Sequence, residues 1–321
     1  MTTALVCGAG LVGRRVARQL ADSDEISHVR VADRRGRRAE AVVGALGGES
    51  SAMRWPLTSL EGVDVVVSAL AGDHDVDVAR RAIDACVPCV SVADSPSTIA
   101  GLRGLDGPAR EAGTTVAIGA GFSPGLTEVL ATHAATLFDE VEEVRLARAG
   151  WSGPASAASV RRTRRDVAAL WRGGKWHEVS KREEQVWFPE PIGPVDCEAV
   201  RAPAEVMVGA IPNLAALTAT LADAERPRRR HARADALGAI RVEVWGTRKG
   251  GRDVVVYGAI DRVSIAAGAV AAIAAIRLVD RARPTPAGVH GVAALVDPLA
   301  AMADLSARGV RSAVFEGAPI S

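Results

Sequence analysis

The sequence predicts an α/β fold in which a doubly wound parallel sheet is combined with a second domain of α+β type. Over residues 1–120, short β-branched segments alternate with helical patterns, which is typical of βαβ units. A glycine-rich turn joins the first of these segments to the first helical pattern. After Pro124 the pattern changes to strands that alternate polar and apolar residues, as in antiparallel sheets with one solvated face.

The parallel sheet of the first domain is predicted from strands that alternate with helices. Asp64–Leu70 is apolar on both of its faces, as expected of a strand that helices cover from both sides. The predicted strands are Ala4–Gly8, Val29–Asp33, Asp64–Leu70, Cys89–Asp94 and Thr114–Gly119, and the predicted helices are Leu11–Ala21, Arg37–Leu46, Val76–Ala85 and Asp106–Ala112.

The second domain is predicted to combine helices with antiparallel strands. In the strand Val144–Ala149 we expect the arginines on one face and the apolar residues on the other, and Lys249–Gly251 is the expected turn of a hairpin. The expected elements are helices Gly125–Leu137 and Ala155–Trp171, hairpin strands Arg241–Trp245 and Asp253–Tyr257, helices Val263–Val279 and Asp297–Arg308, and strand Arg311–Phe315. The predicted domains are residues 1–124, residues 125–284 and residues 285–321.

The composition argues against several classes of partner. Lys and Arg number 39 and Asp and Glu number 38, so no strong net charge attracts nucleic acid or an anionic membrane. The longest apolar run, Ile265–Ile276, has about twelve residues and is too short to span a bilayer. Thr2–Cys7 has the pattern of a strand and not of a leader peptide, so we expect a cytoplasmic protein.

The cysteines are expected to be reduced thiols without a metal. Cys86 and Cys89 have the two-residue spacer of a zinc or redox pair. A structural zinc site needs two further ligands at similar spacing, and the rest of the sequence, including Cys7 and Cys197, does not offer them.

Gly8, Gly10 and Gly13 form a Gly-x-Gly-x-x-Gly pattern between the first predicted strand and helix. In this context the pattern is the fingerprint of a Rossmann-type dinucleotide-binding domain. Gly8 makes the tight turn, Gly10 lets the backbone approach a pyrophosphate, and Gly13 lets the helix pack closely on the strand. Leu11 and Val12 begin the helix, whose free N–H groups and partial positive charge favour phosphate groups.

Asp33 ends the second predicted strand, where an acidic side chain accepts hydrogen bonds from the adenine ribose and repels a 2′-phosphate. The sequence therefore favours NAD over NADP, although Arg34 offers a guanidinium that could hold a 2′-phosphate. Ala69 and Leu70 end a later strand at the carboxyl edge, where open α/β sheets bind their ligands, and are further candidates for cofactor binding.

Gly121–Gly125 matches the Gly-x-Ser-x-Gly pattern of a hydrolase nucleophile elbow. The oxyanion hole of that fold uses the backbone N–H of the residue after the serine, and Pro124 has none. A serine hydrolase is therefore disfavoured, and Pro124 is interpreted as a helix-start signal.

Several segments, in their order along the chain, resemble the reductase type of the saccharopine dehydrogenase family. They are Val92–Asp94, Gly119–Leu126, Gly174–Glu178, Trp187–Gly193, Ala204–Met207 and Ile211–Pro212, and the resemblance covers most of the chain. It implies an NAD(P)-dependent oxidoreductase that acts on the C–N bond of an amino acid or opine, or reduces an imine. It also implies that residues 125–284 form an inserted α+β domain that binds substrate and through which family members often dimerise. Residues 285–321 would then return to the Rossmann-type domain.

The resemblance also implies roles for individual residues. Gly121, Phe122, Pro124 and Gly125 would lie beside the nicotinamide, with Ser123 close to the substrate. Asp94 would face the substrate as well. An arginine of the second domain would bind a substrate carboxylate, and the sequence leaves the choice open among Arg145, Arg148, Arg164 and Arg165.

Hydride transfer needs few acid–base groups beyond one that handles the amine proton. Asp94 is the first catalytic candidate, with capping of the following helix as its alternative role. His177, expected on a surface strand, is the second. Glu128 is a candidate for substrate binding, or else an ordinary carboxylate in the first turn of a helix.

Two other functions remain open from the sequence. One is a non-redox lyase or cyclodeaminase that recycles its bound NAD internally. The other is a catalytically silent regulatory protein that binds NAD(P).

Overall fold

The computed structural model describes residues 1–70, 72, 74–207, 209–223 and 236–316 of the 321-residue chain. The chain divides into two compact units. Unit 1 comprises Met1–Gly125 and Ser264–Val296, and unit 2 comprises Leu126–Val263 and Asp297–Ser321.

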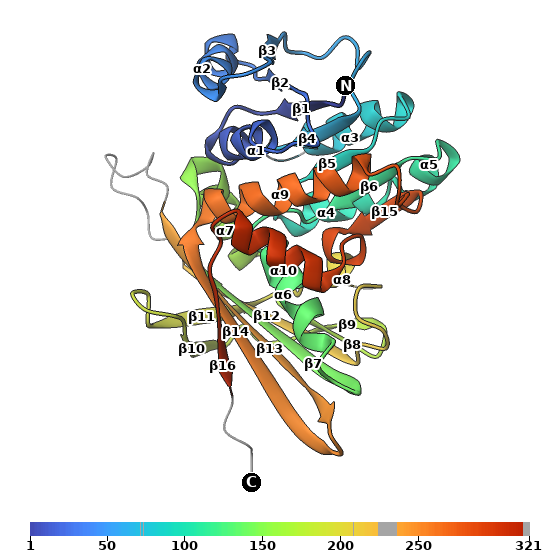
Figure 1. The fold of residues 1–321 in the computed structure, drawn as a ribbon. Coiled ribbons are helices and arrows are strands. Elements are labelled where there is room, and N and C mark those ends of the chain that lie inside the picture. Colours follow the sequence, from blue (N-terminus) through green and yellow to red (C-terminus); the bar gives the residue numbers. More distant parts are fainter. Residues whose placement is uncertain (71, 73, 208, 224–235, 317–321) are drawn as a thin grey trace. The chain divides into compact units, whose positions relative to one another are not determined.

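Unit 1 is built on a sheet of seven strands in the described residues, in the order β15-β6-β5-β4-β1-β2-β3, and all neighbours run parallel (Figure 1). The chain proceeds from β1 to β2 and β3 on one side and returns to β4 on the other, so the topological switch point lies between β1 and β4. The strands are β1 Thr3–Cys7, β2 His28–Ala32, β3 Ser50–Met53, β4 Val65–Ser68, β5 Cys89–Ser91, β6 Thr115–Ile118 and β15 Gly288–Gly291.

The helices of unit 1 follow the predicted pattern, with one addition. Helix α1 has the predicted bounds, and α4 was not predicted. The helices are α1 Leu11–Ala21, α2 Gly36–Leu46, α3 His74–Asp84, α4 Pro96–Arg103, α5 Asp106–Glu111 and α9 Val263–Val279, with a short 3-10 turn at Val292–Ala294. The doubly wound parallel sheet predicted from the sequence is thus confirmed.

Helix α9 has the bounds that its apolar pattern predicts, but it belongs to unit 1 from Ser264 onward. It passes close to α1, because a Cβ atom on Gly268 would lie only 2.7 Å from the Cβ of Arg15. A helix that is apolar on all sides has to be covered on all sides, and α1 provides part of that cover. The second unit therefore ends earlier in this region than the predicted boundary at residue 284.

The C-terminal segment 285–321 does not return to the first domain as a whole. β15 pairs in parallel with β6, so that Gly288 lies opposite Thr115, and it belongs to unit 1. β16 (Ser312–Glu316) instead pairs antiparallel with β14 of unit 2. Backbone pairing to a strand edge is a long-range interaction that the local sequence pattern does not specify.

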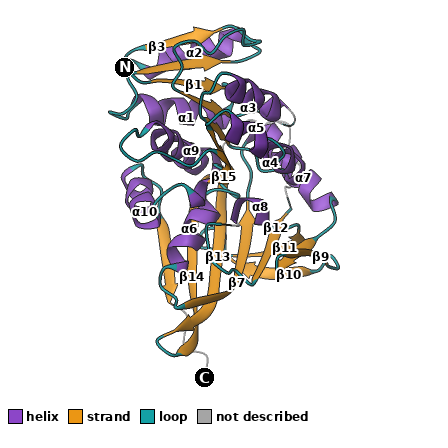
Figure 2. Cartoon of the chain, turned by 90° about the vertical axis from the view of Figure 1, so that its right-hand side faces the viewer, coloured by secondary structure: helices purple, strands orange, loops and turns teal. Residues whose placement is uncertain are grey.

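Unit 2 contains a mixed sheet of nine described strands, seven of them in the order β10-β11-β12-β7-β13-β14-β16, with β8 pairing to β12 and β9 pairing to β8. Its long strands β13 and β14 are prominent in Figure 2. The strands are β7 Glu140–Ala149, β8 Ala169–Arg172, β9 Lys175–Glu178, β10 Glu183–Trp187, β11 Pro194–Val200, β12 Ala216–Ala222, β13 Leu237–Arg248, β14 Gly251–Arg262 and β16. The helices are α6 Leu126–Ala135, α7 Gly153–Arg165, α8 Ala204–Met207 and α10 Pro298–Ala307.

The predicted hairpin is confirmed and is longer than expected, because it extends over all of β13 and β14. Arg248 pairs with Gly251 across a two-residue turn. Lys249 and Gly250 both adopt left-handed backbone conformations, with φ of 53° and 79°. This is the requirement of a type I′ turn, whose twist matches that of the strands it joins.

The predicted helix Ala155–Trp171 is too long. Helix α7 ends at Arg165, and the chain continues as β8, where Trp171 lies opposite Trp176 of β9. The two indole rings meet edge to face with their centroids 5.3 Å apart, and the guanidinium of Arg201 stacks 3.7 Å from the centroid of Trp176. Such cross-strand contacts favour the strand over a continued helix.

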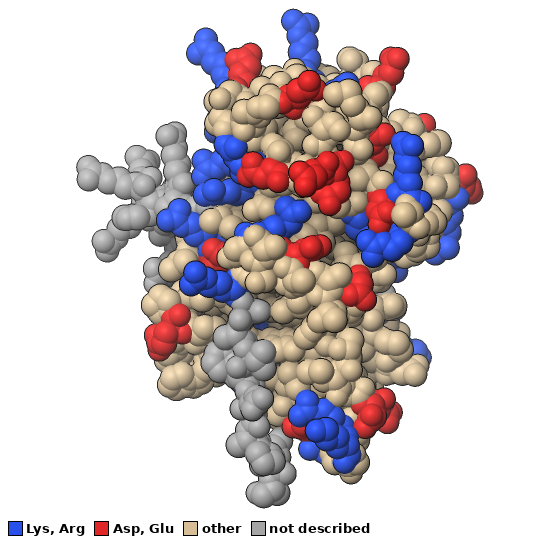
Figure 3. Space-filling model, viewed as in Figure 1, with Lys and Arg blue, Asp and Glu red and all other residues tan. Residues whose placement is uncertain are grey.

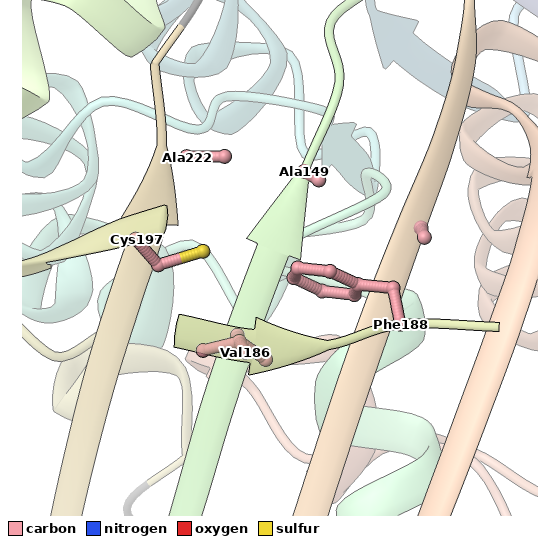
Figure 4. Close-up of a cluster of buried hydrophobic side chains, with 7 residues drawn as sticks. Ala149, Val186, Phe188, Cys197 and Ala222 are labelled. Atoms are coloured by element: carbon pink, nitrogen blue, oxygen red, sulfur yellow. The ribbon is translucent and has the colours of Figure 1, made fainter. Parts of the chain in front are cut away.

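A cluster of small and aromatic side chains forms part of the core of unit 2 (Figure 4). The segment that carries Val186 and Phe188 crosses the sheet, and both side chains pack on small residues such as Ala149. Cys197 completes the cluster, and burial raises the pKa of its thiol to about 12. Cys197 therefore acts as a small apolar side chain.

We expect Phe188→Leu to lower the free energy of unfolding by about 1 to 2 kcal/mol, because it leaves unfilled space in this cluster. Phe188 is 5% exposed, whereas the neighbouring Trp187 is 62% exposed. The matched control Trp187→Leu should change the free energy of unfolding by less than about 0.5 kcal/mol. Urea unfolding measures both changes, and equal effects would contradict the assignment of Phe188 to the core.

The surface carries charges of both signs. On the face shown in Figure 3, Lys and Arg side chains are interspersed with Asp and Glu side chains, as the near-equal totals suggest. Among the helices that the structure describes, none has the length and apolar character needed to cross a bilayer.

Candidate dinucleotide-binding site

Two glycines of the turn between β1 and α1 are required by the packing of the chain itself. Gly8 has a φ of 106°, and a Cβ atom there would lie 2.6 Å from the carbonyl oxygen of Ala69. A Cβ atom on Gly13 would lie 1.7 Å from the carbonyl oxygen of Gly8. The turn therefore closes on itself and on the end of β4, as the predicted roles of these two glycines require.

Gly10 differs from the other two glycines. It is exposed at the N-cap of α1 in an extended conformation, and apart from its two chain neighbours no described residue has an atom within 4 Å of the position that its Cβ would take. No side chain caps the helix there, and Leu11 and Val12 in the first turn are partly exposed. The missing side chain thus leaves space in front of the backbone N–H groups of the helix, where a phosphate can bind.

Asp33 follows β2 and holds the glycine-rich turn in place. Its Oδ2 accepts a hydrogen bond from the backbone N–H of Ala9 at 2.8 Å, and its Oδ1 accepts one from the N–H of Arg35 at 2.8 Å. A carboxylate has about four acceptor positions, so both oxygens retain capacity for ribose hydroxyl groups. The sequence predicted the ribose contact and missed this second, structural role. The side chain of Arg34 is exposed beside it.

Asp94 lies after β5, but it does not cap the next helix. The N-cap of α4 is Ser95, whose Oγ accepts the backbone N–H of Thr98 at 3.3 Å. Asp94 is half-buried, and its charge contributes to the raised pKa of Asp75. Capping, the alternative role considered for Asp94, is therefore taken by its neighbour.

The loop Gly121–Gly125 is tightly closed at the carboxyl edge of the sheet of unit 1. Gly121 donates its N–H to the carbonyl oxygen of Pro124 at 3.0 Å, and a Cβ atom on Gly125 would lie 2.1 Å from the carbonyl oxygen of Gly121. Phe122 and Pro124 are buried, and Ser123 is half-buried. Helix α6 begins at Leu126, so Pro124 precedes the helix and does not occupy its first position.

The loop also lies against the end of β5. Ala120 donates its N–H to the carbonyl oxygen of Ser91 at 2.9 Å, and a Cβ atom on Gly121 would lie 3.2 Å from the carbonyl oxygen of Val92. The structure thus brings the loop into contact with the segment that leads to Asp94. In the same sheet, the ends of β1 and β4 are in contact at Gly8 and Ala69. Leu70 is half-buried next to Ala69.

The arginines of β7 do not share a face, contrary to the prediction. Residues three apart on a strand point to opposite sides, because side chains alternate with a period of two. Arg145 forms a bidentate pair with Glu143 (3.0 and 3.1 Å). Arg148 lies on the other face with Val144 and Leu146, is 6% exposed, and donates to Ser156 Oγ at 3.3 Å.

Arg164 is held by carboxylates of the chain itself. Its guanidinium contacts Glu198 at 2.9 Å and Asp223 at 2.8 Å, with Glu183 at 3.8 Å. These contacts give Arg164 a structural role between α7 and the neighbouring strands. Arg165 is exposed.

Glu128, predicted as a possible first-turn carboxylate of the helix, is 1% exposed within α6. Its Oε2 accepts a hydrogen bond from the hydroxyl of Thr127 at 2.6 Å. Burying an ionisable group in this way carries a desolvation penalty, which suggests a role beyond favouring the helix dipole. Local sequence alone did not reveal this burial.

His177 lies on the exposed strand β9, where its Nε2 is 3.3 Å from the carbonyl oxygen of Arg172. General acid–base catalysis beside a hydride transfer favours a water-excluded setting, and the surroundings of His177 do not provide one. His177 is thus exposed to solvent, whereas Asp94 is half-buried. Within the described residues no group of three or more His, Cys, Asp or Glu side chains is arranged to hold a metal ion.

Known proteins share this architecture. Residues 1–89 match the family model described as shikimate / quinate 5-dehydrogenase. The apo saccharopine dehydrogenase (L-Glu forming) of Saccharomyces cerevisiae is 15% identical, with 98% of this chain and 100% of that chain covered and a TM-score of 0.71. The DAP dehydrogenase of C. glutamicum in complex with DAP is 15% identical over 96% of this chain and 99% of that one, with a TM-score of 0.54.

GenD2 from gentamicin A biosynthesis, in complex with NAD, is 17% identical, with 98% and 97% of the two chains covered and a TM-score of 0.51. At these identities the likeness concerns the fold. The chain has the fold of saccharopine dehydrogenase, and the resemblance predicted from the sequence is confirmed at that level.

Proposed function

We propose that this chain is an NAD-dependent oxidoreductase that transfers a hydride between the nicotinamide and the C–N bond of an amino acid, opine or imine. The observation that carries the proposal is the open space at Gly10, which no side chain of the described residues fills, at a helix N-terminus without a side-chain cap. Packing within the chain explains why positions 8 and 13 are glycine, but it does not explain why position 10 is glycine. A bound diphosphate does account for it.

The residues present fit a dinucleotide. The turn Gly8–Gly13 and the first N–H groups of α1 would hold the diphosphate, and Asp33 would hold the adenine ribose. Ala69, Leu70 and the loop Gly121–Gly125 would line the nicotinamide. When bound, the cofactor supplies the hydride acceptor or donor. One of the structurally similar proteins, GenD2, was crystallised with NAD, which supports this cofactor.

The amino-acid type of substrate is supported by two of the structurally similar proteins, the saccharopine dehydrogenase (L-Glu forming) and the DAP dehydrogenase bound to DAP. In this chain Arg148 is proposed to bind a substrate carboxylate, because its guanidinium is buried and a buried guanidinium binds a carboxylate more strongly than an exposed one does. Asp94 would accept or return the amine proton at its carboxylate. We further propose a cytoplasmic homodimer formed through unit 2.

The proposal is tested by following absorbance at about 340 nm with NAD and a panel of amino acids and opines, and with NADH and keto acid–amine mixtures. We expect turnover for at least one pair and tighter binding of NAD than of NADP. Substrate loss at constant absorbance would indicate a lyase that recycles its NAD. Tight binding without turnover would indicate a regulatory protein, and a clear NADP preference would contradict the role of Asp33.

A further inference from the structure

The ends of three neighbouring strands in unit 1 carry a row of buried side chains. Cys7 of β1 lies opposite Ser68 of β4, and Ser68 lies opposite Ser91 of β5. Residues in register on parallel strands point to the same face of the sheet, so these three side chains share a face. All three are 0% exposed. The next residues in the chain, Gly8 after Cys7 and Ala69 after Ser68, begin the segments assigned above to the dinucleotide.

Asp75, in the first turn of α3, is completely buried against this row. Its Oδ2 accepts a hydrogen bond from the hydroxyl of Ser91. Ser91 Oγ in turn accepts the backbone N–H of Ala93 at 3.1 Å. A continuous chain of hydrogen bonds therefore joins the Asp75 carboxyl to the segment that leads directly to Asp94.

The groups that face this carboxyl offer it no cation among the described residues. β4 and β5 contribute the hydroxyls of Ser68 and Ser91, β1 and β5 contribute the thiols of Cys7 and Cys89, and the segment after β5 contributes the carboxylate of Asp94. Helix α4 packs on α3, and its one charged side chain, Arg103, donates instead to the carbonyl oxygen of Val289. On α3 itself His74 and Asp77 are exposed.

These surroundings place the titration of Asp75 close to neutrality. Burial raises the pKa of Asp75 to about 7; the hydroxyls of Ser68 and Ser91 oppose this rise, and the charge of Asp94 adds to it. Burial, and then the Asp75 charge, raise the pKa of the Cys7 and Cys89 thiols well above the usual range, so both thiols stay neutral. A buried carboxyl with a raised pKa therefore lies against the row of strand ends that leads into the predicted diphosphate site.

We propose that Asp75 is a proton-linked positioning residue of the dinucleotide site, which takes up one proton from solvent when a dinucleotide diphosphate binds to the turn Gly8–Gly13. This inference rests on the proposed function. The diphosphate brings negative charge close to Gly8, next to Cys7 of the buried row, and in a poorly solvated region like charges repel strongly. Converting the Asp75 carboxylate to the neutral acid removes that repulsion.

The sign of the pH dependence follows from linkage. Binding of the diphosphate raises the pKa of Asp75, so the bound state holds more protons than the free state. Affinity is therefore highest where Asp75 is already protonated, below its free-state pKa. It falls as the pH rises through about 7 and becomes constant above the bound-state pKa. Each unit of pKa difference corresponds to about a tenfold change in affinity.

Calorimetric titration of the full chain with ADP-ribose tests this linkage, because ADP-ribose carries the diphosphate but lacks the charged nicotinamide ring. The titration is run from about pH 6 to about pH 9 in two buffers of different ionisation enthalpy, which reports the protons taken up. We expect net proton uptake, of no more than about one proton per site, with a maximum above neutral pH in the wild type and in Asp84→Asn, an exposed control on the same helix. In Asp75→Asn the uptake and the fall in affinity should disappear.

A second variant keeps the ionisable group and changes its surroundings. Ser91→Ala removes a hydroxyl that lowers the pKa of Asp75, so its proton uptake should move to higher pH than in the wild type. Uptake that persists in Asp75→Asn, or that is unmoved in Ser91→Ala, would overturn the inference. Tight binding of ADP-ribose without proton uptake would also overturn it but leave the proposed function intact, whereas no binding at all would overturn both.

Discussion

Gly10→Val is expected to weaken dinucleotide binding by at least ~100-fold, equivalent to about 2.7 kcal/mol, while the protein stays folded. The valine side chain would occupy the space at the N-terminus of α1 that the described residues leave open. The backbone at Gly10, with φ of −78° and ψ of −166°, is extended and open to any residue. We therefore expect the free energy of unfolding to change by no more than about 1 kcal/mol.

Gly13→Ala provides the matched contrast in the same turn. Its Cβ atom would lie 1.7 Å from the carbonyl oxygen of Gly8, so either the helix or the strand must move. This variant should lose several kcal/mol of stability, in the range of severe overpacking, and its binding defect should follow from that loss. Chemical unfolding and titration with NADH separate the two cases. Wild-type affinity in Gly10→Val would mean that the diphosphate does not bind in this space, and it would contradict the proposed function.

The local pattern of the sequence predicts the elements of unit 1 well, because these elements depend on local signals. The bounds of α1 follow from its helical periodicity and those of α9 from a continuous apolar run, and each signal is confined to about three to five turns of chain. The glycine pattern also predicts a strand directly before α1 and an acidic residue directly after β2. The sheet order and the assignment of α9 and β16 to units depend instead on pairings between segments far apart in sequence, which no local window contains.

Burial of polar groups is the main feature of the candidate site that the sequence does not reveal. Asp75 precedes the predicted helix Val76–Ala85, and Glu128 has the spacing of an ordinary first-turn carboxylate. Both are completely buried in the structure, because neighbouring strands and helices cover them. The arginine pattern of β7 is different. The odd spacing between Arg145 and Arg148 is sufficient to place them on opposite faces, so a stricter use of the two-residue period would have separated them.

Arg148→Met is expected to lower kcat/KM for a carboxylate-bearing substrate by about 10²- to 10³-fold, equal to about 3 to 4 kcal/mol, with little change in the affinity for NADH. Methionine retains much of the buried aliphatic volume and removes the charged fork that would hold a carboxylate. Arg148 is nearly inaccessible to bulk solvent, so water would not replace the lost hydrogen bonds. The loss should appear mainly in KM if the contact is equally strong in ground state and transition state.

Arg145→Met is the matched control, because it removes the same charge from the same strand on the opposite face. Arg145 pairs with Glu143 and stacks near the ring of Trp245, with its guanidinium carbon 5.2 Å from the ring centroid. An exposed pair of this kind contributes only about 0 to 1 kcal/mol. Steady-state kinetics should therefore show nearly wild-type kcat/KM for Arg145→Met. Equal losses in the two variants would mean that charge on this strand, and not the buried position of Arg148, determines substrate binding.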